Sequence, residues 1–161
     1  MGNCSQVSQC VVSLKQAVQR SIQEEACEDL KKALKKLSRV LLIGVDEEIA
    51  MVKSLSLNAL GYALATGKLR AFKYLKDKLH ASPVAMESKL SLQQTSGINL
   101  LCQNGNLEFI RYYLPIYLES ELKEASTVSM GGFYHAYLAY SIIQKTTPVQ
   151  IAVNAGRIDI L

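Results

Sequence analysis

The chain has 161 residues, of which 49% are hydrophobic and 20% are charged. This length gives room for one domain, and the composition can bury a core, which excludes a mainly disordered chain. No apolar run approaches the ~20 residues that a membrane-spanning helix needs, and no secretory signal is recognisable. We therefore expect a cytoplasmic protein, with association to a membrane or to the cytoskeleton left open.

The net charge of +4 is concentrated near the N-terminus. Residues 1–45 contain seven basic and four acidic side chains, whereas the rest of the chain contains eleven basic and ten acidic ones. A local excess of positive charge favours an anionic partner for this part of the chain.

Residues 7–41 contain neither glycine nor proline, and their apolar residues recur every three or four positions. This spacing is typical of an amphipathic helix. Two interpretations fit: one long helix, or a helical hairpin whose turn lies in the polar stretch 23–29. We expect a flexible N-terminus over residues 1–6, followed by an amphipathic helical segment over residues 7–45.

The second half of this segment carries a basic face. Its members are Lys31, Lys32, Lys35, Lys36 and Arg39. The ordinary interpretation is a solvated face opposite a core face. The alternative is that the basic face binds an anionic membrane or an acidic protein surface. It lacks interleaved aromatic residues, so we expect no nucleic-acid partner.

Residues 46–161 contain a pattern that occurs three times, centred on Gly67, Gly105 and Gly156. Nine positions before each glycine stands a residue that caps helices well, and apolar residues recur at matching distances around the glycine. These capping residues are Asn58, Ser96 and Thr147. Each unit is therefore predicted to be a capped helix, a glycine in the left-handed conformation and the start of a second helix.

At the third unit the sequence resembles the ankyrin-repeat family. Residues 147–152 read TPVQIA and follow the family's opening T-P-L-H-x-A, while residues 59–75 and 97–114 are weaker copies. The resemblance covers roughly residues 55–161. It implies an all-α fold, a helical-repeat solenoid of divergent ankyrin-like units, preceded by the amphipathic helix or helical hairpin.

The array departs from the family in its spacing. Successive glycines are 38 and 51 residues apart, against an ankyrin period of about 33 residues. Pro115 is expected to interrupt or kink the second helix of its unit. Leu161 falls inside a second helix, so we expect the array to continue beyond residue 161 or to be covered there by a partner.

The N-terminal residues Met1-Gly2-Asn3-Cys4 are typical of an N-myristoylated protein, with Cys4 and Cys10 available for palmitoylation. Gln6 stands where that pattern has Ser or Thr, so an unmodified terminus is the alternative. Gly2 and Cys4 are thus lipidation candidates. One myristoyl chain binds membranes only marginally, so anchoring needs a second signal such as Cys4 acylation or the basic face.

We expect no catalytic residues, no metal site and no cofactor. The four cysteines lack the C-x-x-C spacing of zinc sites, and His80 and His135 have no ligand set around them. Both histidines are predicted to lie at the surface, and Cys27 and Cys102 to be small core residues.

The ankyrin resemblance implies a non-enzymatic scaffold that binds a protein partner. We expect the partner to contact residues 89–95, 130–140 and 144–146. Aromatic candidates within the inserted segment are Phe133, Tyr134, Tyr137 and Tyr140. Two alternatives stay open: a structural component of a membrane or cytoskeletal assembly, and the regulatory head of a longer enzyme or channel.

Overall fold

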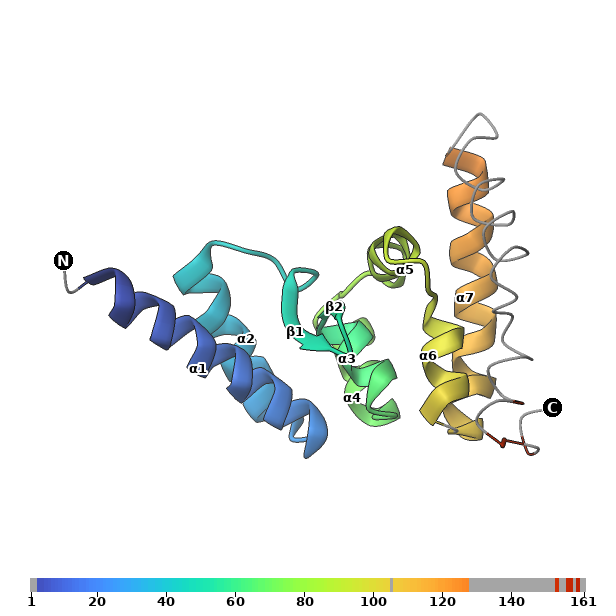
Figure 1. Cartoon of the computed structure of the whole chain (residues 1–161), viewed down its shortest axis with the longest axis horizontal. Coiled ribbons are helices and arrows are strands. Elements are labelled where there is room, and N and C mark those ends of the chain that lie inside the picture. The colour runs from blue at the N-terminus through green and yellow to red at the C-terminus, as the bar shows by residue number, and fades with distance from the viewer. Residues whose placement is uncertain (1–2, 105, 128–152, 154–155, 158, 160–161) are drawn as a thin grey trace. The chain divides into compact units, whose positions relative to one another are not determined.

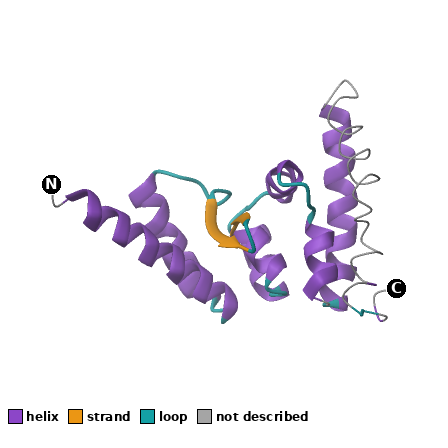
Figure 2. Cartoon of the chain, in the orientation of Figure 1, coloured by secondary structure: helices purple, strands orange, loops and turns teal. Residues whose placement is uncertain are grey.

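The computed structural model of the chain describes residues 3–104, 106–127, 153, 156–157 and 159. These residues form seven helices and one two-stranded antiparallel sheet (Figure 1). Figure 2 shows that helix dominates the described chain, which confirms the predicted helical character in coarse terms. The chain divides into two compact units, Met1–Ser82 and Pro83–Leu161, and each is described by itself.

The first unit begins with a helical hairpin. Helices α1 (Asn3–Gln23) and α2 (Cys27–Leu41) pack against each other (Figure 1). In the turn between them Glu25 has a φ of 52°, and the Ala26 N–H donates to the Ser21 carbonyl at 3.0 Å. Of the two interpretations of residues 7–45, the hairpin is therefore the one that the structure has.

Helix α1 begins at Asn3, four positions before the predicted start of the helical segment. Residues 3–6, which were predicted to belong to the N-terminus that precedes the helical segment, are thus helical in the structure. No helix-breaking residue occurs between Asn3 and the end of α1, and the Ser8 hydroxyl donates to the Ser5 carbonyl at 3.1 Å. Because no residue in this stretch strongly disfavours helix, the helix extends to Asn3.

A β-hairpin follows, which the all-α prediction did not include. Strands β1 (Glu48–Val52) and β2 (Leu55–Asn58) pair antiparallel, with Val52 opposite Leu55. The two turn residues, Lys53 and Ser54, have φ values of 47° and 69°. Positive φ at both positions matches the twist of the strands that a two-residue loop joins. The described residues therefore fit the all-α prediction broadly, with this small sheet as an element that the prediction did not include.

Helices α3 (Ala59–Ala65) and α4 (Leu69–Asp77) form the first of the predicted glycine-centred units. The Asn58 side chain accepts a hydrogen bond from the Gly61 N–H at 2.9 Å, so it caps α3 as expected. Gly67 has a φ of 70°, which is the left-handed conformation predicted for it.

The second unit contains helices α5 (Pro83–Leu92), α6 (Gly97–Asn104) and α7 (Leu107–Thr127). The predicted cap of α6 is present, because the Asn99 N–H donates to the Ser96 hydroxyl at 3.3 Å. Helix α5 was not predicted, and it makes residues 89–92 helical where a partner-binding loop was expected. Gly156 has the predicted positive φ, 68°. Gly105 and Thr147 lie outside the described residues.

Helix α7 passes through Pro115 without ending, so the expected interruption of the helix is wrong. Proline removes the hydrogen bond that the Arg111 carbonyl would accept. Both residues are exposed, so water can satisfy that carbonyl. Phe109 and Tyr113 are fully buried on the opposite side, and their packing favours the helix across the proline.

A buried carboxylate joins the three helices of the second unit. Glu87 of α5 is 4% exposed. Its two carboxylate oxygens accept the Gly97 N–H of α6 at 3.0 and 3.2 Å, and Oε1 also accepts the Tyr113 hydroxyl of α7. A negative charge at the N-terminus of α6 is favourable, because the helix dipole is positive there.

We predict that Glu87→Ala lowers the free energy of unfolding by about 3 kcal/mol, because it leaves the Gly97 N–H and the Tyr113 hydroxyl without their buried acceptor. Tyr113→Phe should lower it by about 1–2 kcal/mol. Urea unfolding of both single variants and the double variant measures the coupling. If the two losses simply add, the contact between Glu87 and Tyr113 does not stabilise the unit.

Candidate functional site

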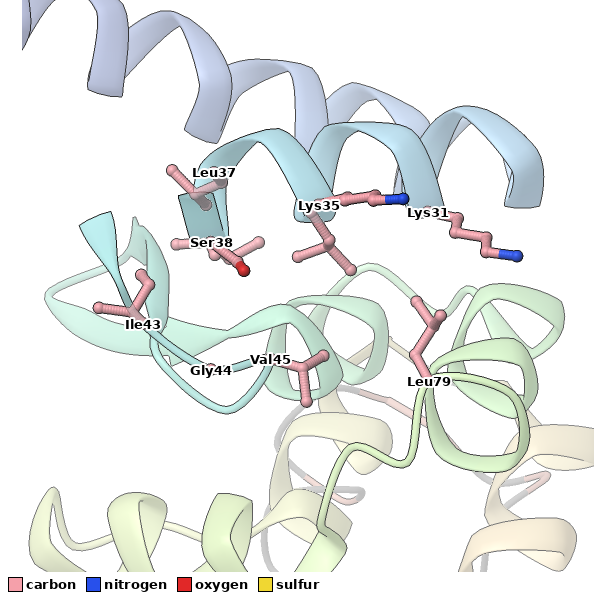
Figure 3. A pocket seen from close by; sticks show the side chains of 10 residues that line it. Lys31, Lys35, Leu37, Ser38, Ile43, Gly44, Val45 and Leu79 are labelled. Carbon is pink, nitrogen blue, oxygen red and sulfur yellow. The ribbon is translucent and has the colours of Figure 1, made fainter. Parts of the chain in front are cut away.

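An apolar groove with a volume of about 290 Å³ lies beside α2 in the first unit (Figure 3). One wall is α2, and the other consists of the loop that leads from α2 to β1 together with Ile49 of β1 and Leu79, which follows α4. We call it the α2 groove and define it by its lining residues. They are Lys31, Leu34, Lys35, Leu37, Ser38, Ile43, Gly44, Val45, Ile49 and Leu79.

The amphipathic pattern of α2 explains its wall of the groove. Leu30 and Leu37 are buried, while Leu34 is half-buried at the groove. Lys31 and Lys35 are four positions apart and so lie on the same edge of the helix. Both lysines are exposed, and their side chains border the apolar lining (Figure 3).

Asp46 fixes the loop that forms the other wall. Its carboxylate accepts the Ser82 N–H at 2.9 Å, and its carbonyl accepts the Asn58 side-chain N–H at 3.4 Å. Leu42 ends α2 in the left-handed conformation, with a φ of 54°, and its side chain is 91% exposed. The chain therefore reverses just after α2 and returns alongside it.

Helix α1 holds the hairpin of α1 and α2 in place. The Gln19 side chain donates to the Ile49 carbonyl at 2.8 Å, and the Gln23 side chain donates to the Tyr62 hydroxyl at 2.6 Å. Val18 and Ile22 of α1 are fully buried. Because both groove walls are anchored to the same core, the groove is formed before any ligand binds.

The basic face lies on the exposed side of α2, as the sequence predicts. All five side chains are exposed, and none forms an ion pair or hydrogen bond with another described residue. Two of the five, Lys31 and Lys35, also line the α2 groove. The structure thus brings part of the basic face together with an apolar depression, which the sequence analysis did not foresee.

A sequence signal for the groove does exist. The apolar run at residues 40–45 overlaps the end of the basic amphipathic helix and contains Gly44. A helix and an apolar return loop would place basic and apolar groups side by side. No such local pattern predicts that Leu79 lines the groove, because Leu79 lies 30 positions after Ile49, the preceding lining residue in the chain.

The other predicted site residues do not come together with the groove. His80 is exposed and Cys102 is buried, as predicted, whereas Cys27 is only half-buried. Gly2, the Cys4 side chain and His135 lie outside the described residues. The same holds for the aromatic candidates Phe133, Tyr134, Tyr137 and Tyr140.

Two further features are absent from the described residues. No cluster of three or more His, Cys, Asp or Glu side chains placed to hold a metal ion occurs among them. None of the helices in this part of the chain is long and apolar enough to cross a membrane.

Comparison of the chain with protein-family models, with curated proteins and with solved structures gives no match. The ankyrin-like array over roughly residues 55–161 therefore stays a prediction.

The three described cysteines should differ in reactivity. Burial raises the pKa of the Cys102 thiol, so both access and thiolate content are low there, whereas Cys10 is exposed. We predict that iodoacetamide modifies Cys10 first, Cys27 more slowly, and Cys102 only when the protein is unfolded. Peptide mass spectrometry over time measures the order. Rapid modification of Cys102 in the folded protein would contradict the burial of this side chain.

Proposed function

We propose that the chain is a non-enzymatic protein-interaction module, built on helical, ankyrin-like units. One observation supports this function best: the α2 groove adjoins a basic face whose five charges have no counter-ion among the described residues. An apolar depression beside exposed charges combines the two properties that protein interfaces use, which are burial of apolar surface and electrostatic selection.

Three exposed apolar side chains occur on the elements that form or adjoin the groove walls. Val40 at the end of α2, Leu42 just after it and Met51 of β1 are 44%, 91% and 63% exposed. Transfer of exposed apolar area out of water is favourable at about 25 cal/mol per Å². A protein partner that covers these side chains would gain this free energy.

A lipid tether at Gly2 or Cys4 is compatible with this function. It would locate the module at a membrane, and the groove would stay available to a partner. Helix α2 itself is poorly suited to insert into a bilayer, because Leu30 and Leu37 of its apolar face are buried within the first unit.

The test compares crosslinked partners of the wild-type chain with those of Lys31→Glu/Lys35→Glu. Charge reversal at the groove should reduce the recovery of specific partners roughly tenfold, because like charges then meet across the interface. The matched control is Lys53→Glu/Lys78→Glu, which reverses two exposed lysines that do not line the groove. Quantitative mass spectrometry measures recovery. The same partners at the same levels for both variants would refute an interaction role for this surface.

A further inference from the structure

We infer that the α2 groove binds an acidic amphipathic helix of a partner protein. This inference rests on the proposed interaction function and goes beyond it by naming the chemistry of the partner. It combines three features of the groove: its apolar lining, the positions of two lysines at its edge, and the absence of carboxylates paired with them among the described residues.

The apolar lining selects a partner with apolar anchors. Six of the ten lining residues are Leu, Ile or Val. The volume of about 290 Å³ is just below the range for small-molecule pockets, about 300–1,000 Å³. A groove of this size suits one or two side chains of a docked helix. Helix-in-groove recognition places such anchors three or four positions apart.

The two lysines select the charge of the partner. Lys31 and Lys35 are one helical turn apart, so their Cα atoms are separated by about 6 Å along α2. A helix that lies alongside α2 matches this spacing with Asp or Glu at positions i and i+4. The remaining charges of the basic face add a positive field that attracts such a helix and speeds its association.

A peptide helix fits these features better than a membrane surface does. The groove is a depression beside a helix, lined by apolar side chains from α2 and from the chain that returns alongside it (Figure 3). A bilayer presents a broad surface, which contacts the exposed lysines but not the lining below them. A helix presents single projecting side chains that enter the depression.

Gly44 provides a way to block the groove without disturbing the fold. It lines the groove, and a Cβ atom added to it would meet no atom within 4 Å. Its φ is not in the left-handed region, so a side chain causes no backbone strain there. Gly44→Phe should therefore fill part of the groove, and Gly44→Ala is the matched control.

The probe is a fluorescent helical peptide with leucines at three- and four-residue spacing and two glutamates four positions apart. Its twin carries lysines in place of the glutamates. Fluorescence anisotropy should show that the full chain binds the acidic peptide at least tenfold more tightly than the basic twin. Gly44→Phe should weaken binding roughly tenfold, whereas Gly44→Ala, which adds only one methyl group to the lining, should weaken it less than twofold.

Two pairs of lysines on one helix provide the decisive comparison. Lys31→Ala/Lys35→Ala removes the charges at the groove, and Lys32→Ala/Lys36→Ala removes the same net charge from α2 away from the groove lining. We expect the first pair to weaken binding roughly fivefold and the second less than twofold. Circular dichroism and the thermal midpoint show that each variant is folded.

Several results would overturn the inference. They are no binding of the acidic peptide, equal losses for the two lysine pairs, and unchanged binding by folded Gly44→Phe. Tighter, groove-dependent binding of phosphatidylserine vesicles would assign the site to a membrane and also overturn it. If the peptide fails while crosslinked partners still depend on Lys31 and Lys35, the interaction function stands and only the acidic helix is wrong.

Discussion

The contact that links the turn between α1 and α2 to α4 is made by Glu25, whose carboxylate accepts the Ala71 N–H at 3.2 Å. Lys68, which precedes α4, makes no side-chain cap, so this turn supplies an acceptor for one of the free N–H groups at the start of that helix. The same contact ties the start of α2 to α4. Since α2 is one wall of the groove, a contact that caps another helix also helps to hold this wall in place.

Features that act within one helical turn could be predicted from the sequence. The caps at Asn58 and Ser96 need only an acceptor three positions before an N–H group, and the conformation of Gly67 needs only the absence of a Cβ atom. The basic face follows equally from the period of the helix. These signals predicted where the helices of two units begin and which side of α2 meets solvent.

Features that depend on tertiary packing could not be predicted in this way. The β-hairpin turns at Lys53 and Ser54, which lack the Asn-Gly signature of such turns, so the surrounding core must favour their positive φ values. Helix α7 continues through Pro115 because burial of Tyr113 outweighs one lost hydrogen bond. The groove joins α2 to Leu79 across more than forty positions, and no local pattern encodes that contact.

The groove edge is positively charged because the acidic residues near α2 lie at helix N-termini and do not pair with its lysines. Glu25 caps α4, while Glu28 and Asp29 lie in the first turn of α2, where the helix dipole favours negative charge. Arg39 lies in the last turn, where the dipole favours positive charge, while Lys31 and Lys35 lie in the middle of the helix. Since the acidic residues near α2 act at helix N-termini, none of them pairs with these two lysines, and the groove edge of α2 stays cationic.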